Sequence, residues 1–223
     1  MLESLNLRIN MVNNQLKPCG INNQSILNIF SEVPRELFLS YGQEANFYSD
    51  NIVFFSKKKK IENRYMLSPS IFARMLQIAE IKAEEKVLDI GCLTGYSTVV
   101  LSKLCKNVVG IDNDQDLIDT AIQIAKKMEA KNIKFHLNSL KKGCPSGSKY
   151  DLIFINGAVD FIPDELEGQL TKNGRLVCIF FENKIGRVCV FKKSSQATDK
   201  INFFEVSVPH ITKDFKEKSV FSF

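Results

Sequence analysis

The sequence has little of what metal or thiol chemistry requires. Its only histidines are His136 and His210, and its six cysteines include no CxxC pair. Several cysteines lie in apolar runs such as LVCIFF at residues 176–181, where a reduced cysteine behaves as a small hydrophobic side chain. We therefore expect no metal site. The scattered thiols indicate a reducing, cytoplasmic compartment.

Long apolar runs and a strong charge of one sign are also missing. No run reaches the roughly 18 residues that span a bilayer, and the N-terminus, with Glu3 among polar residues, lacks the apolar stretch of a signal peptide. The net charge of +5 is nearly accounted for by four consecutive lysines at residues 57–60. We expect neither a membrane nor nucleic acid as a partner. The lysine run is either a solvated loop or a contact for an acidic substrate.

The composition that remains is typical of a globular chain, with 44% hydrophobic and 25% charged residues over 223 positions. This length favours one domain with an extension. Apolar residues recur at helical spacing up to about residue 45, and residues 46–62 look like irregular strand and exposed loop. We therefore divide the chain into an N-terminal helical extension or lid (1–62) and a second part (63–223), and we expect one compact unit.

From residue 69 the sequence alternates between helical periodicity and short apolar runs, which is typical of βαβ units in a parallel sheet covered on both faces. A turn signal at 183–186 favours a hairpin. We expect an α/β fold with a doubly wound, mostly parallel, Rossmann-like sheet, an antiparallel C-terminal hairpin and an N-terminal helical extension. The expected helices lie at residues 69–81, 95–105, 114–129 and 163–170. The expected strands lie at residues 86–90, 107–111, 132–137, 150–155, 175–181, 187–193 and 203–208.

The turn after the first expected strand carries the functional signal. Residues 87–96 read VLDIGCLTGY, and in doubly wound sheets a ligand binds at the carboxyl end of this strand. Gly91 and Gly95 let the backbone approach a ligand, and the helix that follows supplies unpaired N–H groups. Asp112 ends the second strand 21 positions after Gly91, where a carboxylate can accept hydrogen bonds from both ribose hydroxyls.

The spacing of the glycines selects among nucleotide cofactors. A dinucleotide site needs GxGxxG, of which only the first glycine is matched, and a phosphate-binding Walker loop needs a lysine where Tyr96 stands. The remaining pattern, DxGxxxG with an acid ending the next strand, is that of methyltransferases that use S-adenosylmethionine (SAM). Asp89 suits a ligand with a sulfonium and an ammonium group and would repel a pyrophosphate. The alternative is a βαβ turn whose glycines serve packing alone.

Sequence blocks outside this turn resemble the protein-L-isoaspartate O-methyltransferase family. The resemblance is colinear over most of residues 8–180, and residues 64–77, RYMLSPSIFARMLQ, are similar to a divergent bacterial branch of that family. The other matching blocks are Arg8-x-x-Met11-Val12-x-x-Gln15-Leu16, Val33-Pro34-Arg35-Glu36-x-Phe38, Tyr150-Asp151-Leu152-Ile153, Ile162-Pro163-x-x-Leu166-x-x-Gln169-Leu170 and Gly174-Arg175-Leu176-Val177.

The resemblance implies an enzyme of protein repair, a transferase that uses SAM to methylate a carboxylate of isoaspartyl residues in damaged proteins. Its partners would be isoaspartyl-containing peptides or proteins. A carboxylate is already ionised at pH 7 and needs no general base, which agrees with a chain poor in histidine. Two alternatives stay open: a methyltransferase for another acceptor, because a fold does not fix the substrate, and a catalytically silent methyltransferase-like binding protein. None of these patterns indicates the oligomeric state.

The expected cofactor site departs from the family at three places. Leu93 replaces a glycine, and a leucine at positive φ would cost about 1–2 kcal/mol and crowd the methionine part of SAM. Asn138-Ser139-Leu140 replaces a GDG whose acid meets the adenine, and Tyr65 and Leu67 replace hydroxyl residues near the reacting carboxylate. The residues expected to bind the cofactor are Asp89, Gly91, Cys92, Leu93, Gly95, Tyr96, Asp112, Asn113, Ser139, Leu140 and Asn156.

Four residues near this site have two interpretations each. Ser68 is either the catalytic hydroxyl, displaced by one position from the family pattern, or the N-cap of the helix that begins at Pro69. Asn156 either faces the methyl group or belongs to a plain turn. Tyr96 either stacks near the cofactor or simply starts a helix. Arg64 either pairs with a substrate carboxylate or forms a surface salt bridge.

Overall fold

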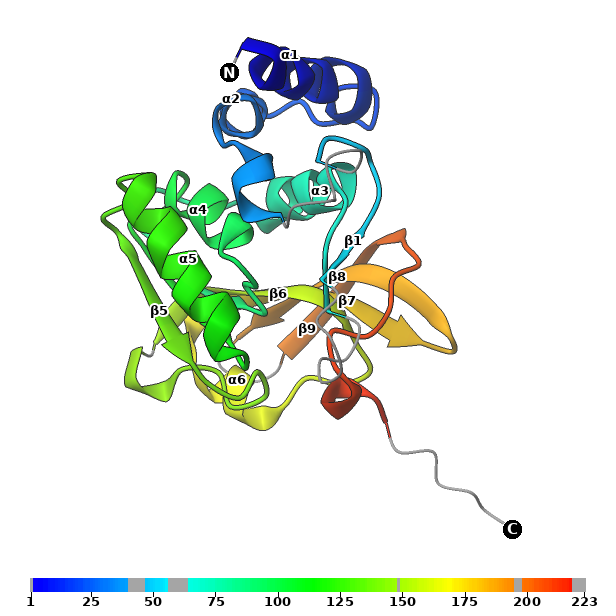
Figure 1. The fold of residues 1–223 in the computed structure, drawn as a ribbon. Coiled ribbons are helices and arrows are strands. Elements are labelled where there is room, and N and C mark those ends of the chain that lie inside the picture. The colour runs from blue at the N-terminus through cyan, green and yellow to red at the C-terminus, as the bar shows by residue number, and fades with distance from the viewer. Residues whose placement is uncertain (1, 40–46, 56–63, 148, 195–197, 218–223) are drawn as a thin grey trace.

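A seven-stranded sheet forms the centre of the computed structural model, which describes residues 2–39, 47–55, 64–147, 149–194 and 198–217 (Figure 1). The strand order is β5-β4-β3-β6-β7-β8-β9. The pairs among β3 to β7 are parallel, and β8 and β9 continue the sheet in antiparallel pairing. The expected fold is confirmed. The strands are β3 (Lys86–Ile90), β4 (Asn107–Asp112), β5 (Ile133–Leu137), β6 (Tyr150–Val159), β7 (Leu170–Glu182), β8 (Ile185–Lys193) and β9 (Thr198–Glu205).

Helices cover the sheet on both faces because the central strands are apolar on both sides. One buried cluster joins the sheet to α3, α4 and α5, and a second joins it to α6 and to Phe215 near the C-terminus. The helix starts follow local capping: Ser68 and Asp114 each accept a hydrogen bond from a backbone N–H of the first turn. These helices are α3 (Pro69–Ala79), α4 (Tyr96–Ser102), α5 (Gln115–Lys127) and α6 (Asp164–Gly168).

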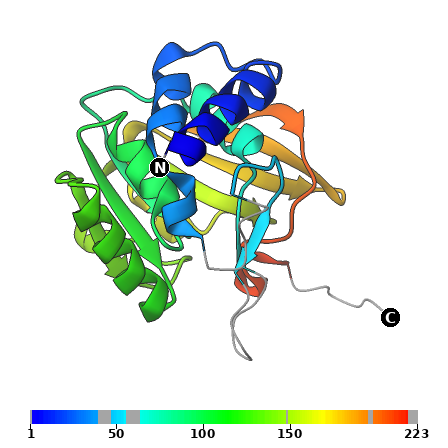
Figure 2. The same ribbon diagram turned by 45° about the horizontal axis from the view of Figure 1, so that its top comes forward.

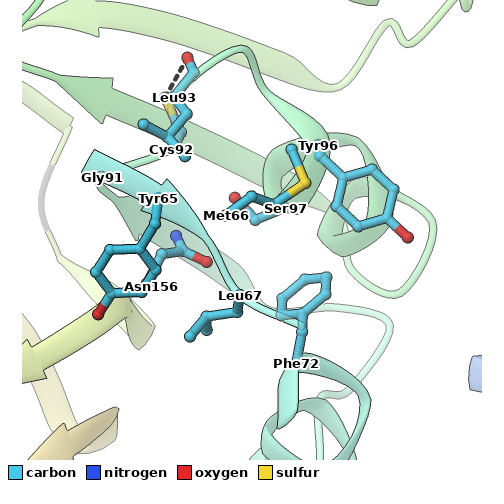
Figure 3. A pocket seen from close by; sticks show the side chains of 10 residues that line it. All are labelled: Tyr65, Met66, Leu67, Phe72, Gly91, Cys92, Leu93, Tyr96, Ser97 and Asn156. Carbon is cyan, nitrogen blue, oxygen red and sulfur yellow. Dashed lines mark hydrogen bonds between the residues drawn. The ribbon is translucent and has the colours of Figure 1, made fainter. Parts of the chain in front are cut away.

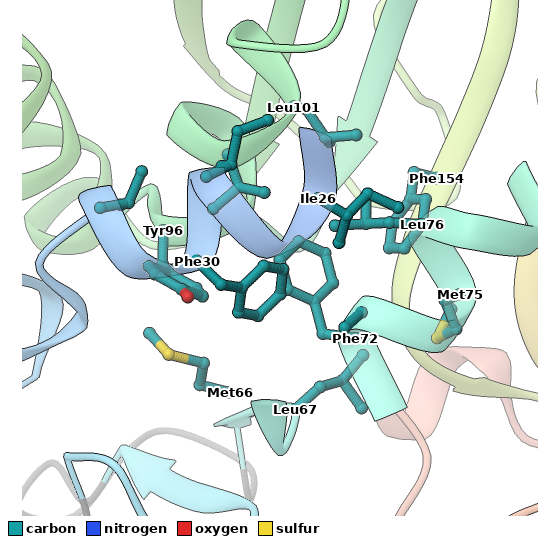
Figure 4. Packing of buried hydrophobic residues seen from close by; sticks show 14 of the residues in the cluster. Ile26, Phe30, Met66, Leu67, Phe72, Met75, Leu76, Tyr96, Leu101 and Phe154 are labelled. Atoms are coloured by element: carbon teal, nitrogen blue, oxygen red, sulfur yellow. The ribbon is translucent and has the colours of Figure 1, made fainter. Parts of the chain in front are cut away.

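The N-terminal segment packs on the outer side of α3 (Figures 1 and 2). It consists of α1 (Leu2–Met11), a π-helical turn η1 (Val12–Leu16), α2 (Gln24–Glu32) and a 3₁₀ turn η2 (Arg35–Phe38). Phe30 of α2 meets Phe72 of α3 and Tyr96 of α4, with ring centroids 5.8 and 6.4 Å apart (Figure 4). The N-terminal segment therefore shares one hydrophobic core with the helices on the sheet. None of the helices in the described part of the chain has the length and apolarity that a bilayer crossing requires.

A short antiparallel ladder, β1 (Val53–Phe55) with β2 (Arg64–Met66), connects the N-terminal segment to α3. Phe55 pairs with Arg64 in this ladder. The lysine run at residues 57–60 lies outside the described residues.

Three strands differ from the sequence prediction. Strands β6 and β7 are both longer than expected, and the last strand lies at Thr198–Glu205 rather than at residues 203–208. Strand β9 is at the edge of the sheet and most of its side chains are exposed or half-buried, so it lacks the apolar run that we used to find strands. The chain after β9 returns across the sheet, where His210 forms an isolated bridge with Ala158.

Candidate functional site

The candidate site is a crevice at the carboxyl end of β3, which has β4 on one side and β6 on the other. This is the switch point at which α/β sheets bind ligands. The space left between the lining side chains is about 10 Å³, close to the minimum for a single water molecule. The lining residues are Tyr65, Met66, Leu67, Phe72, Gly91, Cys92, Leu93, Tyr96, Ser97 and Asn156 (Figure 3).

The turn after β3 is built on three residues with positive φ: Gly91 (75°), Leu93 (53°) and Gly95 (92°). Gly91 faces the crevice, because a Cβ added to it would lie 2.5 Å from the Ile211 Cδ1 atom. Gly95 faces away, against Ala121 on α5. The first glycine therefore lets the Ile211 side chain approach the backbone at the site, whereas the second allows close packing against α5.

Leu93 adopts the left-handed backbone conformation whose cost we considered for its position, and its side chain is buried at 3% exposure. This conformation directs the Leu93 N–H to the Asp112 Oδ2 atom at 2.9 Å. The strained residue thus supplies one of the donors that hold the carboxylate.

Leu93→Gly should be more stable than Leu93→Ala by about 1–2 kcal/mol, since only glycine escapes the left-handed penalty. In most positions the order is reversed, because glycine is destabilising by roughly 0.5–1 kcal/mol relative to alanine. Both variants should unfold more easily than the wild type, because both lose the buried leucine side chain. Urea denaturation of the three proteins measures the order. An alanine variant as stable as the glycine variant would contradict the strain at Leu93.

Asp89 is fully buried at the end of β3, and protein donors occupy its carboxylate. The hydroxyls of Ser97 and Thr98 donate to Oδ2 at 2.7 and 2.6 Å, and Asn156 Nδ2 donates to Oδ1 at 2.6 Å. Desolvation by burial raises the Asp89 pKa to about 6, although the three donors act in the opposite direction. Because Asn156 lies within β6, its interpretation as part of a plain turn is wrong.

Asp112 at the end of β4 is also fully buried and forms an ion pair with Arg64. Arg64 Nη1 and Nη2 donate to Oδ1 and Oδ2 at 3.0 and 2.8 Å, and Nη1 also donates to the Asn113 Oδ1 atom at 2.9 Å. The Arg64 side chain is only 3% exposed. The expectation of a surface salt bridge for Arg64 is therefore wrong, because β2 carries this side chain inward to the crevice wall.

Three other expected residues near the crevice make packing or helix-capping contacts within the protein. Tyr96 is the first residue of α4, and its ring packs against Phe38 and Phe72. Cys92 is buried, and desolvation raises its thiol pKa well above the usual value, which keeps this thiol protonated and unreactive. Ser68 accepts the Ile71 N–H at 3.4 Å as the N-cap of α3. A role of Ser68 toward a substrate stays a prediction.

The segment after β5 lies beside Asp112 but does not line the crevice. The Asn138 N–H donates to the Asp112 carbonyl at 2.9 Å. Ser139 is exposed, and Leu140 is buried in the cluster on the α6 face of the sheet. The adenine contact that the resemblance implies for these two residues stays a prediction.

Two segments that are distant in the sequence close the crevice, and no sequence pattern predicted either contact. From the C-terminal side, Ile211 lies against Gly91, and its N–H donates to the Ala158 carbonyl at 2.9 Å. From the N-terminal side, Arg35 Nη2 donates to the Leu67 carbonyl at 2.9 Å. The Tyr65 hydroxyl donates to the Pro209 carbonyl at 2.5 Å. The residue in the family's threonine position thus binds the chain's own C-terminal segment.

The polar groups of the crevice fit a nucleoside that carries a positive charge, although the side chains of the crevice leave no space for it in this structure. Gly91 provides backbone approach, and Asp112 has carboxylate oxygens for two neighbouring hydroxyls. In this arrangement the guanidinium of Arg64 holds both oxygens, and Ile211 covers Gly91. A nucleoside can enter only when these side chains move. Within the described ranges, no group of three or more His, Cys, Asp or Glu side chains is arranged to hold a metal ion.

Two larger hollows lie elsewhere, and neither is lined by an expected site residue. One of about 670 Å³ borders the β7–β8 hairpin, where the rings of Phe181 and His210 stack. The other, of about 390 Å³, lies at the amino ends of β3 and β4 and includes Lys86, Lys134 and His136. The crevice beside β3 thus remains the candidate site because of its residues rather than its size.

Comparisons with known proteins point to one family. Residues 8–212 match the family model described as protein-L-isoaspartate(D-aspartate) O-methyltransferase. The chain is 32% identical over 177 residues to protein-L-isoaspartate O-methyltransferase 1 of Syntrophobacter fumaroxidans, covering 79% of this chain and 80% of that protein. It is 31% identical over 173 residues to the protein-L-isoaspartate O-methyltransferase of Aliivibrio fischeri, with coverages of 78% and 81%.

Solved structures show the same fold. A protein-L-isoaspartate O-methyltransferase superposes with a TM-score of 0.79 at 25% identity over 92% of this chain, which spans 65% of that chain's length. A putative protein-L-isoaspartate O-methyltransferase from Plasmodium falciparum, solved with S-adenosyl-L-homocysteine, superposes with a TM-score of 0.76 at 19% identity, covering 92% of this chain and 98% of the other.

Proposed function

Because the chain belongs to the protein-L-isoaspartate(D-aspartate) O-methyltransferase family, we propose that it transfers a methyl group from SAM to the carboxylate of isoaspartyl residues in damaged proteins. The observation that carries this proposal is the family match over residues 8–212. That range includes the turn after β3 and the segments that close the crevice from both sides. Enzymes of this family are methyltransferases, and SAM is their cofactor.

The bound cofactor supplies a methyl group activated by its own sulfonium. The protein therefore has to bind and orient the two reactants and to exclude water. Proximity of this kind can lower the activation barrier by several kcal/mol. With SAM bound, Asp112 would accept hydrogen bonds from the ribose hydroxyls, and Gly91 would let the nucleoside approach the backbone. The isoaspartyl carboxylate is ionised at neutral pH and attacks without a general base.

The segments on either side of the crevice exclude water. Residues 1–62 serve as the lid of the catalytic part at 63–223, and Phe38 of this lid accepts a hydrogen bond from the Thr94 hydroxyl at 2.6 Å. Ile211 and Pro209 cover the opposite side. With the cofactor bound, these two segments would keep water out of the site, and a carboxylate is a better nucleophile when water is excluded.

Two peptides that differ only in one linkage test the proposal. With methyl-labelled SAM, a peptide that contains isoaspartate should become labelled, whereas its normal aspartyl twin should not. The measurement is base-labile methyl ester in each peptide. Equal labelling of both peptides, or of neither, would contradict the isoaspartyl assignment and favour another acceptor.

The closed crevice is the observation that favours the second candidate, a silent scaffold that no longer binds the cofactor. S-adenosylhomocysteine (SAH), the demethylated cofactor, separates the two in the same samples. At about 100 times its Kd, a ligand that binds only the folded state adds about 2.7 kcal/mol of stability. We expect this shift in the thermal unfolding of the wild type. An unchanged Tm at millimolar SAH would support the silent scaffold.

We place the enzyme in the cytoplasm, with isoaspartyl proteins as its partners and without nucleic acid or membrane among them. All six cysteines are free thiols, and five of them are buried. A reducing compartment keeps thiols in this state.

A further inference from the structure

Arg64 binds the two carboxylate oxygens of Asp112, which are the atoms that the ribose of a nucleoside would contact. Asp112 accepts four hydrogen bonds: two come from the backbone N–H groups of Leu93 and Asn113, each at 2.9 Å, and two come from the Arg64 guanidinium. The backbone donors are fixed by the turn and can stay when a ligand binds. The guanidinium is the donor that can leave, because it is carried on a long side chain.

The guanidinium and a ribose present the same pattern to a carboxylate. Arg64 offers two parallel N–H donors to the two oxygens of Asp112, in the bidentate geometry that makes such pairs strong. The two neighbouring hydroxyls of a ribose offer two O–H donors to the same oxygens. The two groups therefore compete for Asp112.

Loss of this contact would leave the Arg64 charge without a partner in a buried place. The side chain is 3% exposed, and a buried charge that loses its partner is strongly destabilising. Nucleoside binding therefore leaves the buried Arg64 guanidinium without a counter-ion, which is unfavourable unless another anion binds to Arg64.

We infer that Arg64 binds the carboxylate of the acceptor. Before the cofactor binds, Arg64 pairs with Asp112, and the ribose of the cofactor displaces Arg64 from that pair. The inference rests on the proposed function, which supplies both the nucleoside and the anionic acceptor. Arg64 Nη2 would lie only 3.1 Å from a Cβ built on Gly91, so the guanidinium already borders the crevice. The acceptor carboxylate restores the counter-ion that Asp112 gives up to the ribose.

The departure of the chain from its family at β2 supports this role. The family's hydroxyl positions hold Tyr65 and Leu67, and the Tyr65 hydroxyl is committed to Pro209. Neither side chain offers a free donor to a carboxylate. Arg64, one residue before Tyr65 on β2, places a cation next to the same part of the crevice.

The charge balance of the transfer also fits. The methyl group moves from the sulfonium to a carboxylate oxygen, so that the cofactor becomes a neutral thioether, the acceptor becomes a neutral ester, and no proton is transferred. Arg64 then loses its anion for a second time. Re-formation of the pair with Asp112 displaces the nucleoside, which favours release of the products.

Calorimetric titration of SAH, with and without an isoaspartyl peptide, tests the inference. In the wild type, saturating peptide should lower the Kd of SAH at least about fivefold, the lower end of typical coupling between sites. Arg64→Lys keeps the charge but loses the fork that matches a carboxylate. This variant should bind SAH more tightly than the wild type when no peptide is present, and peptide should change its SAH affinity less than about twofold, below the range of such coupling.

Arg187→Lys is the matched control, because Arg187 on β8 pairs with Glu205 on β9, away from the crevice. It should behave as the wild type in both titrations. Undiminished coupling in Arg64→Lys, or SAH binding weaker than in the wild type, would overturn the role of Arg64 while the wild type still methylates isoaspartyl peptide. A wild type that binds SAH with peptide-dependent affinity but labels no isoaspartyl peptide would instead reject the proposed acceptor. A wild type that does not bind SAH overturns both.

Discussion

Replacing Asp112 with asparagine should lower the free energy of unfolding by about 3–5 kcal/mol, because it leaves the buried Arg64 charge without a counter-ion. The side chains of Arg64 and Asp112 are 3% and 0% exposed, so water cannot compensate for the loss. The same change should abolish SAH binding at concentrations that saturate the wild type, since the amide cannot accept from both ribose hydroxyls. Urea denaturation and calorimetric titration measure the two effects.

A double variant separates these two effects. Arg64→Met combined with Asp112→Asn removes both charges, and replacement of a whole buried ion pair is often neutral or stabilising. We expect this variant to recover most of the lost stability but not SAH binding. Asp119→Asn, on the exposed face of α5, is the control and should stay within about 0.5 kcal/mol of the wild type. Wild-type SAH affinity in Asp112→Asn would falsify the assignment of the ribose contact.

Stability should depend on pH through Asp89. Burial raises its pKa from 3.8 to about 6 in the folded protein, so the folded state holds a proton between these pH values that the unfolded state has lost. The resulting stabilisation is complete below about pH 4 and disappears as the pH rises through 6. Each pKa unit corresponds to about 1.4 kcal/mol, so the loss from this group is about 3 kcal/mol.

Asp89→Asn removes this dependence, because asparagine does not titrate. The difference in unfolding free energy between wild type and variant should shift by about 2.5 kcal/mol in favour of the variant from pH 4 to pH 7. The contributions of the other carboxyl groups to the unfolding free energy cancel in this difference. Asp119→Asn should show no such shift. A difference that stays constant over this range would contradict the raised pKa of Asp89 in the folded protein.

Much of the crevice could be predicted because residues close together in the sequence form it. The run VLDIG makes a strand and a glycine turn, and Asp112 ends the neighbouring strand in the parallel register that its position implies. The positive φ of Leu93 was predictable for the same reason, since the residue stands where the turn favours glycine. The boundaries of β6 and β9 were less predictable. Strand β6 continues through Asn156 and Gly157, a pair typical of turns, and β9 is an edge strand whose side chains are exposed or half-buried.

What the sequence alone determined is the chain of local patterns: the alternation of strands and helices, the turn after β3 and the acid at the end of β4. These follow from backbone preferences and hydrophobic periodicity, which act over a few residues. Only the tertiary structure decided that Arg64 reaches Asp112, 48 positions away, and that Ile211 covers Gly91. Contacts of this range depend on how packed segments meet, and no periodicity in the sequence encodes them.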